Sequence, residues 1–370
     1  MRRAIALLVI FIIMACKKDK GYIGIEKSNI SLGDKITPVW QSEEFTLFKS
    51  GEIHRSYFAA SGIQLNDSTA FFISTRSITD DDYAAGDLIS KQVRTSDSFL
   101  NLLNIDGDVF KENDAKMNVV SPNIYRYKGE LHVIYLKQES YDVSDIYIVK
   151  SLDEGTTWSE EKKINTKKLF HIIMNNSVTV TKSGRIIVAA ATTANIEKNY
   201  NDQAIICYYS DDNGKTWSSS SRLVSNTPLM EPSIAQLNSG KLLMVIRSRL
   251  GKLLFSESPD NGATWSKIKM SNIDAPASQP LLSSIGNQVA LVWNNTPPGK
   301  HVFDRNPLSL STTEDGITWS SPVTIAGQDS AMYSSPSIFK LDNTWVLLYN
   351  KSLSSNASKY DMVFKILKLK

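Results

Sequence analysis

Cysteine and histidine are scarce in this 370-residue chain, which has two of the first and four of the second. Metal centres in proteins are usually built from such side chains placed close together. No such cluster is visible, because these residues are scattered along the chain at Cys16, Cys207, His54, His132, His171 and His301. We therefore expect no metal ion, and the sequence gives no sign of an organic cofactor.

An excess of charge is also lacking, since 41 Lys and Arg face 38 Asp and Glu, for a net charge of +3. No basic stripe is present that could meet the phosphates of a nucleic acid, so we expect no nucleic-acid partner. The sequence also lacks a long amphipathic helix pattern. A chain of this length can bury a large core without cross-links.

The one long apolar run lies at the N-terminus, where Arg2 and Arg3 precede residues 4–13. The run is too short for a stable membrane anchor and is typical of a secretory signal, here residues 1–15. Ala15 followed by Cys16 resembles a bacterial lipobox, which implies a lipidated Cys16. Acyl chains on Cys16 would hold the protein at a membrane and exclude an intrachain disulfide. The alternative is an ordinary signal cut nearby, with Cys16 incidental.

The lipobox reading predicts a tether over residues 16–40 and a place in the cell envelope. The lipid anchor would then sit in the outer membrane, with the protein either periplasmic or exposed at the surface. The remaining residues, 41–370, are expected to form one folded domain, and we expect a monomer.

A phrase of the form Ser/Thr-x-Asp/Glu-x-Gly-x-Thr-Trp occurs four times, at residues 151–158, 210–217, 258–265 and 312–319. Glu314 occupies the aspartate position of the last copy. The copies are about 50 to 60 residues apart, and repeats of this length that are rich in short strands indicate the four-stranded blades of a propeller. The sequence therefore predicts an all-β fold, a six-bladed β-propeller. Six apolar segments of strand length support it, at residues 72–74, 132–135, 184–191, 240–247, 289–293 and 345–349.

The repeated phrase resembles the Asp-box, which implies a structural role for it. Its glycine permits the positive φ that a tight hairpin requires, and its aspartate can accept hydrogen bonds from the turn. The resemblance places these hairpins on a rim away from the central pocket. Asp153, Asp212 and Asp260 are therefore not candidates for catalysis.

Other residues carry a closer resemblance, to the bacterial sialidases, over roughly residues 45–360. Glu231 begins one strand segment and Arg247 ends the next, Arg305 precedes the last Asp-box, and Tyr333 follows it. The family shows this order at similar spacing. The resemblance implies that Tyr333 is the nucleophile, that Glu231 is its base, and that Arg247 and Arg305 bind the substrate carboxylate.

The chemistry agrees with these roles. Guanidinium groups bind a carboxylate through charge-assisted, bidentate hydrogen bonds. A tyrosine nucleophile avoids the repulsion between an anionic substrate and a carboxylate, although it must be helped to ionise. Each of these residues could instead be an ordinary strand or loop residue.

The N-terminal half matches the family less closely. Arg55 is expected to be the third arginine of the carboxylate site, although Ile53-His54-Arg55 lacks the proline of the family motif. Arg76 is expected to flank the site. Asp81 is expected to be the general acid/base, with Asp80 and Asp82 as alternatives in the same acidic loop. Further pocket residues are suggested, which could equally be turn residues: Tyr125, Asn175 and Asn176.

The resemblance implies a retaining exo-α-sialidase that releases terminal sialic acid from glycoconjugates, with sialylated glycans as partners. Two alternatives stay open. One is a related glycosidase for another acidic sugar, suggested by the altered motif at Arg55. The other is a propeller that binds glycans without cleaving them.

Overall fold

The computed structural model describes residues 24–52, 56–77, 86–94, 107–297, 304–328, 330–353 and 359–369. Almost all regular structure in these residues is β-strand, and the one helix found there is the short 3-10 helix η2 (Tyr200–Asp202). The described part contains no helix of the length and apolar character that a membrane crossing requires.

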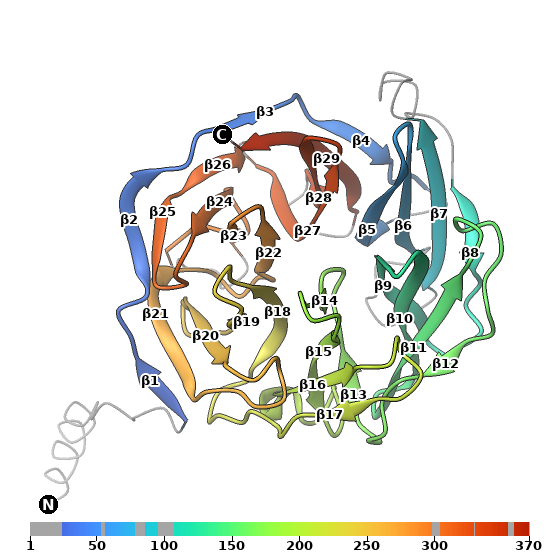
Figure 1. Cartoon of the computed structure of the whole chain (residues 1–370), viewed down its shortest axis with the longest axis horizontal. Helices are drawn as coiled ribbons and strands as arrows, with labels where there is room; N and C mark the ends of the chain where they lie inside the picture. The colour runs from blue at the N-terminus through green and yellow to red at the C-terminus, as the bar shows by residue number, and fades with distance from the viewer. Residues whose placement is uncertain are drawn as a thin grey trace, which may run out of the picture.

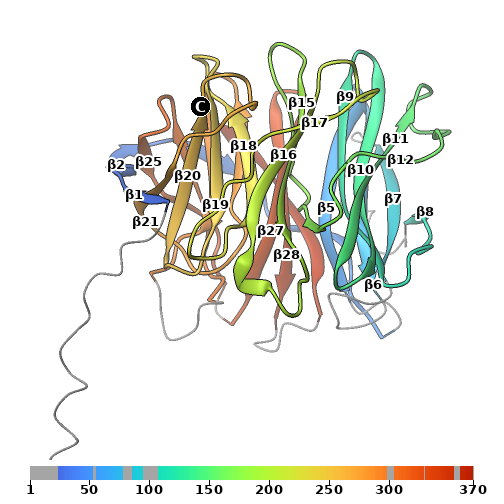
Figure 2. The ribbon, with the colours of Figure 1, turned by 90° about the horizontal axis from the view of Figure 1, so that it is seen from below.

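The strands form a circle of six blades around a central axis, which confirms the all-β propeller (Figure 1). Figure 2 shows the same circle from the side, with the strands running between its two faces. Blades 1 to 3 are β5 (Ser56–Asn66) to β8 (Asp108–Lys111), β9 (Asn118–Tyr127) to β12 (Lys162–Lys163), and β14 (Val178–Val180) to β17 (Ser218–Ser219). Blades 4 to 6 are β18 (Met230–Gln236) to β21 (Ile268–Asp274), β22 (Leu281–Ile285) to β26 (Val323–Ala326), and β27 (Met332–Leu341) to β29 (Asp361–Leu369).

Within each blade the strands pair antiparallel in sequence order, except that β24 of blade 5 pairs with β26 while β25 pairs with β2. The second strand of every blade is one of the six apolar segments predicted from the sequence: β6 (Thr69–Ser77), β10 (Glu130–Ser140), β15 (Ile186–Thr193), β19 (Leu242–Arg247), β23 (Gln288–Asn294) and β28 (Thr344–Ser352). The central residues of these strands are mostly apolar because neighbouring blades cover both of their faces. The remaining strands are β7 (Gly86–Arg94), β11 (Val143–Ser151), β13 (Phe170–Ile172), β16 (Ala204–Ser210), β20 (Lys252–Ser258), β24 (Leu308–Thr313) and β25 (Thr318–Ser321).

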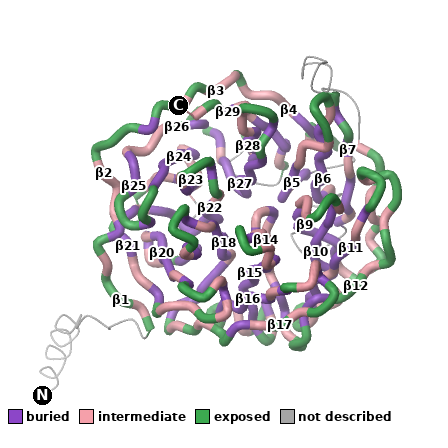
Figure 3. Tube along the Cα trace, in the orientation of Figure 1, coloured by how far each residue is buried: buried purple, intermediate pink, exposed green. Residues whose placement is uncertain are grey.

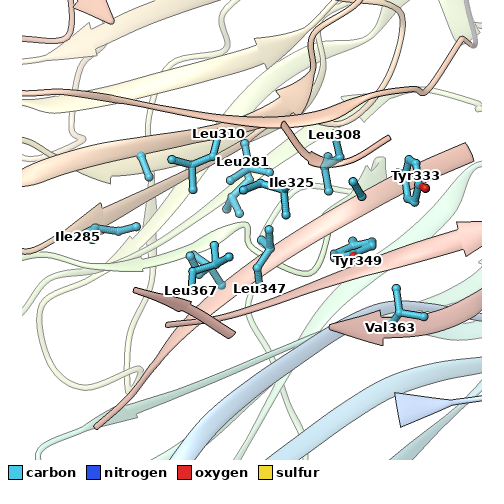
Figure 4. Close-up of a cluster of buried hydrophobic side chains, with 14 of the residues drawn as sticks. Leu281, Ile285, Leu308, Leu310, Ile325, Tyr333, Leu347, Tyr349, Val363 and Leu367 are labelled. Carbon is cyan, nitrogen blue, oxygen red and sulfur yellow. The ribbon is translucent and has the colours of Figure 1, made fainter. Parts of the chain in front are cut away.

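The core is divided into six hydrophobic clusters, one at each interface between neighbouring blades. Between blades 1 and 2, for example, Phe71 and Ile73 pack with Val133 and Tyr135. Figure 3 shows buried positions throughout the circle of blades, and Figure 4 shows the cluster between blades 5 and 6. The propeller is therefore held by six cores of similar kind.

An N-terminal strap, defined as residues 24–48, runs along the outer edges of blades 4, 5 and 6 (Figure 1). Its strands β1 (Ile25–Lys27) and β2 (Ser31–Ile36) pair parallel with β21 and β25, and β3 (Val39–Gln41) and β4 (Phe45–Phe48) pair antiparallel with β29.

The strap differs from the sequence expectation, which treated residues up to 40 as a tether. Its strands are short and mostly half-exposed, so they carry little of the apolar pattern that marks a strand in a sequence. They form because the outer blade edges offer unpaired backbone groups.

The hairpins of the repeated phrase, named Asp-box hairpins here after the motif that they resemble, follow the third strands of blades 2 to 5. In the first three copies the hydroxyl of Ser151, Ser210 or Ser258 donates to the aspartate two residues later and accepts from the glycine N–H. The aspartate also accepts from the threonine before the tryptophan. These hairpins lie at the face where the second strands begin.

The fourth copy is shifted by one residue. Here Thr313 donates to Asp315, which also accepts from the N–H groups of Ile317 and Thr318. Asp315 therefore accepts the hydrogen bonds of the turn, a role that the sequence pattern predicted for Glu314. The turn is one residue shorter, so the regular spacing misplaces the carboxylate.

Candidate active site

Four innermost strands carry a β-bulge at the same height, near the start of β5, β9, β18 and β27. At each bulge one non-glycine residue has a left-handed backbone: Ala59 (φ 52°), Ser121 (φ 59°), Glu231 (φ 37°) and Ser335 (φ 49°). Such a conformation costs roughly 1–3 kcal/mol in a non-glycine residue, and it concentrates at functional sites. The bulges lie beside the propeller axis, at the face opposite the Asp-boxes.

Glu231 and Arg247 face each other across the first hairpin of blade 4, where Met230 pairs with Arg247. One terminal nitrogen of Arg247 donates to both Glu231 carboxylate oxygens, at 2.7 and 2.6 Å. Both side chains are largely buried. A buried ion pair contributes little net stability, because desolvation offsets much of the attraction. Its presence next to a strained backbone therefore suggests a role in binding or catalysis.

Glu231, Arg247 and Arg305 line one cavity of about 350 Å³, which is bounded by residues of all six blades. One carboxylate and two guanidinium groups are the charged groups among its described lining residues, so an anionic ligand suits it. The volume lies at the small end of ligand sites and fits a single small molecule.

The cavity has a polar and an apolar side. The polar side comes from blades 4 to 6 and includes Gln279, Ser334, Ser335 and Asn350 beside the three charged residues. The other side comes from blades 1 to 3 and is mostly apolar, with Phe58, Val120, Leu136, Phe170, Ile172 and Ile173 beside the polar Ser121, Gln138 and Tyr200. A ligand held here presents its charged part to blades 4 to 6.

Tyr333 is next to the cavity, but its side chain is not part of the lining. Its ring is 1% exposed and belongs to the cluster between blades 5 and 6. Figure 4 shows it beside Tyr349, with the ring centroids 5.9 Å apart. Its hydroxyl accepts a hydrogen bond from the N–H of Gln328 at 3.0 Å, and its own N–H donates to the carbonyl of Arg305 at 2.9 Å. The structure therefore brings Glu231, Arg247 and Arg305 together without the Tyr333 hydroxyl.

Two other tyrosines do line the cavity. Tyr200 belongs to η2, and its hydroxyl contacts the sulfur of Met230 at 3.4 Å. Tyr360 precedes β29. Neither tyrosine belongs to a sequence motif that would mark it as a site residue.

Arg76 is the penultimate residue of β6 and donates two hydrogen bonds to Asp87 on β7, at 3.0 and 2.6 Å. It is not among the residues lining the cavity. The other predicted site residues lie outside the described part of the chain: Arg55, Asp81, its alternatives Asp80 and Asp82, and the lipidation site Cys16.

Of the three further pocket residues suggested by the sequence, none lines the cavity. Tyr125 lies in blade 2 near the opposite face, where its hydroxyl is 2.8 Å from Nδ1 of His132. Asn176 donates to the carbonyl of Leu282. Asn175 belongs to blade 3 and lies near the axis, where its side chain forms hydrogen bonds with Ala60 of blade 1, Ser335 of blade 6 and Gln279 of blade 5.

An inner-strand repeat of four residues marks the start of the innermost strand in every blade. Its clearest copies are Ser-Pro-Asn-Ile at 121–124, Glu-Pro-Ser-Ile at 231–234 and Ser-Pro-Ser-Ile at 335–338. The equivalent segments are 59–62, 175–178 and 279–282. Most first positions, Ser121, Glu231, Gln279 and Ser335, line the cavity. This second repeat was the signal that could have located the cavity from the sequence.

The third position of the inner-strand repeat joins neighbouring blades. Ser61 accepts from the N–H of Ile124, and Ser233 accepts from that of Leu282. Asn123 accepts from the N–H of Ser177 in blade 3, and Ser337 donates to Ala60. Four of the six first positions therefore line the cavity, whereas these third positions form hydrogen bonds between neighbouring blades.

The comparisons with known proteins agree with this architecture. The family model described as a BNR repeat-like domain matches residues 107–348, which is well over half of the chain. The chain belongs to the BNR repeat-like domain family. Over 105 residues the chain is 30% identical to a sialidase from Paraclostridium sordellii, and this match covers 25% of each of the two proteins.

Solved structures of similar fold include sialidases. A protein of unknown function from Dyadobacter fermentans has a TM-score of 0.71 at 15% identity, covering 90% of this BNR repeat-like chain and 100% of its own. Trypanosoma rangeli sialidase in complex with sialic acid has a TM-score of 0.64 at 15% identity, covering 90% and 59%. The NanB sialidase from Streptococcus pneumoniae has a TM-score of 0.67 at 14% identity, covering 87% and 70%. At these identities the likeness shows the fold alone.

Proposed function

We propose that this protein is a glycoside hydrolase, a retaining exo-α-sialidase that releases terminal sialic acid from glycoconjugates. The observation that carries the proposal is the convergence of Glu231, Arg247 and Arg305 on one axial cavity. Sialic acid carries a carboxylate on its anomeric carbon, and guanidinium groups are suited to bind it. A cavity of about 350 Å³ suits one terminal sugar, which favours exo-cleavage.

The proposed reaction has two steps. A tyrosine oxygen attacks the anomeric carbon while a general acid protonates the leaving glycosidic oxygen, and water then releases the sugar. We assign Tyr333 as nucleophile, Glu231 as its base and Asp81 as general acid/base. For Tyr333 to act, its hydroxyl has to leave the N–H of Gln328 and reach the cavity beside Ser334. Arg55 and Arg76 are proposed to complete and flank the carboxylate site.

We also propose that Cys16 is lipidated and holds the protein in the cell envelope, where its substrates would be sialylated glycans at the cell surface. This part of the proposal rests on the N-terminal sequence. Mass spectrometry of the mature N-terminus tests it, because lipidation adds the mass of acyl chains to Cys16.

A second candidate is a propeller that binds acidic glycans without cleaving them. One observation favours it, namely that the Tyr333 ring packs between blades 5 and 6 instead of lining the cavity. A binder requires the two arginines but no nucleophile.

The test is hydrolysis of a 4-methylumbelliferyl sialoside by the wild type and by Tyr333→Phe. We expect the wild type to release the fluorophore and Tyr333→Phe to lose at least about a hundredfold in kcat, because no oxygen remains to form the covalent intermediate. Tyr125→Phe, at the opposite face, is the matched control.

The other outcomes separate the candidates. Full activity of Tyr333→Phe would refute its role, and Tyr200→Phe and Tyr360→Phe would then show whether a cavity tyrosine replaces it. A wild type that binds sialic acid in calorimetry without turnover would favour the binder. Release from fluorogenic glycosides of other acidic sugars alone would assign the cavity to a different acidic sugar.

A further inference from the structure

Gln279 presents a buried acceptor in the cavity. It occupies position one of the inner-strand repeat in blade 5, lines the cavity and is 6% exposed. Its Nε2 donates to Oδ1 of Asn175 at 3.3 Å. Its Oε1 is buried and has no hydrogen-bond partner among the residues that the structure describes.

Asn175 fixes which end of the Gln279 amide is the acceptor. The amide nitrogen of Asn175 lies 2.8 Å from the carbonyl oxygen of Ala60 and 2.9 Å from that of Ser335. Only an NH₂ group can stand between two carbonyl acceptors, so the Asn175 oxygen must face Gln279. Gln279 therefore turns its own NH₂ group to Asn175, which leaves Oε1 as the free end of the amide.

Other amides that line the cavity are already satisfied. Oε1 of Gln138 accepts from Nδ2 of Asn118 at 3.1 Å. Oδ1 of Asn350 accepts from the N–H of Ala59 at 3.4 Å, and its Nδ2 donates to the carbonyl of Tyr57. The open acceptor of Gln279 is thus a property of this residue and not of every amide in the cavity.

Burying an acceptor without a donor is unfavourable, so such a group in a cavity calls for a donor from the ligand. We propose that Gln279 is a specificity-determining residue whose Oε1 accepts a hydrogen bond from a neutral donor of the bound sugar, either a hydroxyl group or an acylamino N–H. The inference rests on the proposed function. A cationic donor is disfavoured, because Arg247 and Arg305 line the same cavity. Asn175 is then a positioning residue that acts through Gln279.

The test compares the full chain with its Gln279→Leu variant, using calorimetry with 2-deoxy-2,3-didehydro-N-acetylneuraminic acid as the probe. We expect the Kd of Gln279→Leu to rise about tenfold, as for the loss of one hydrogen bond to a neutral group. Gln236→Leu, at the far end of β18, is the matched control and should bind as the wild type does.

A series of probes that each lack one hydroxyl group or the acylamino group identifies the donor. One such probe should bind the wild type about tenfold more weakly than the parent, and should lose nothing further with Gln279→Leu. Asn175→Leu should raise the Kd of the parent probe. It should leave unchanged the Kd of the analogue that lacks the donor to Gln279. A Kd unchanged in Gln279→Leu, with a wild type that binds the probe, would overturn the inference and leave the proposed function standing.

A wild type that does not bind the probe would count against the proposed function, and the same variants would then be measured with glucuronic and galacturonic acid. The Tm of the ligand-free proteins decides the inference even if none of these sugars binds. We expect Gln279→Leu to melt within about 2 °C of the wild type, because its one weak bond adds little to the fold. A loss of more than about 5 °C would show that Gln279 serves the structure, and would overturn the inference.

Discussion

Glu231 combines a left-handed backbone with a largely buried ion pair to Arg247. Neither feature is favourable on its own, since one strains the chain and the other removes two charges from water. Together, the backbone conformation and the ion pair hold the charged groups of Glu231 and Arg247 beside the propeller axis. A carboxylate ligand bound there would compete with Glu231 for Arg247.

Single substitutions in the Glu231–Arg247 pair should affect binding and hydrolysis differently. Glu231→Gln should bind sialic acid at least as tightly as the wild type, because Arg247 keeps its charge and loses its partner, while hydrolysis falls about a hundredfold or more. Arg247→Met should weaken binding about a hundredfold through the loss of charge-assisted bonds. Calorimetry and fluorogenic assays measure the two effects separately.

Arg185→Met provides the control, because Arg185 forms a similar pair with Asp211 at the opposite face. Equal loss of binding in Glu231→Gln and Arg247→Met would contradict the assignment, since it would mean that the pair acts only as a structural link.

The order of Glu231, Arg247 and Arg305 along the chain predicted that they share a site. The structure places all three in the lining of one cavity, and their roles in catalysis and binding stay predictions. The side-chain direction of Tyr333 could not be found in that way, because it depends on the bulge between Ser334 and Ser337. Gln279 was missed because its role follows from contacts with Asn175, a residue more than a hundred positions away.

The Asp-box hairpin is the element whose chemistry the structure describes most fully. The hydroxyl and backbone N–H of Thr157 donate to Asp153 and, with Ser151, lower the pKa of its carboxyl from 3.8 to about 2. Because the pKa is lower in the folded state, these bonds add stability above about pH 4. That stability is lost as the pH falls from about 4 towards 2.

Asp153→Asn should therefore unfold at a lower urea concentration than the wild type at pH 6, and the difference between the two should shrink as the pH approaches 2. Urea unfolding at a series of pH values measures it. Asp108→Asn, at an exposed position of β8, is the control and should show no such trend. A difference that does not change between pH 6 and pH 2 would mean that the Asp153 charge plays no part.

Elements differ in how well the sequence marks them. The second strands were predicted because their central residues are buried on both faces and are therefore mostly apolar. The strap strands were not predicted, because they form through backbone pairing with the blade edges and their own side chains show little of the apolar pattern of a strand. The fourth Asp-box shows the same limit, since its turn length decides that Asp315 and not Glu314 binds the turn.

Six hydrophobic clusters between neighbouring blades hold the whole molecule together, and the strap pairs with the outer edges of the last three blades. Ile30 of the strap is buried in the cluster between blades 4 and 5, together with Trp319. We expect Ile30→Ala to lower the free energy of unfolding by about 2–5 kcal/mol, as for other buried aliphatic truncations. Ligand affinity should not change, because the cavity lies on the axis and the strap on the outer edge.

Chemical unfolding gives the free energy, and calorimetry with the cavity ligand gives the affinity. Val224→Ala is the matched control, because Val224 is an aliphatic residue that is 63% exposed. An unfolding free energy of Ile30→Ala equal to that of the wild type would show that the strap lies on the propeller without stabilising it.

The inner-strand repeat has a consequence for how such proteins diverge. Several of its third positions join neighbouring blades, while four of its first positions line the cavity with serine, glutamate or glutamine side chains, namely Ser121, Glu231, Gln279 and Ser335. A substitution at one of these four cavity-lining positions can therefore change the ligand while the hydrogen bonds that the third positions make between blades are kept. Descendants of one ancestral propeller can in this way acquire new substrates through one mutation in one blade at a time.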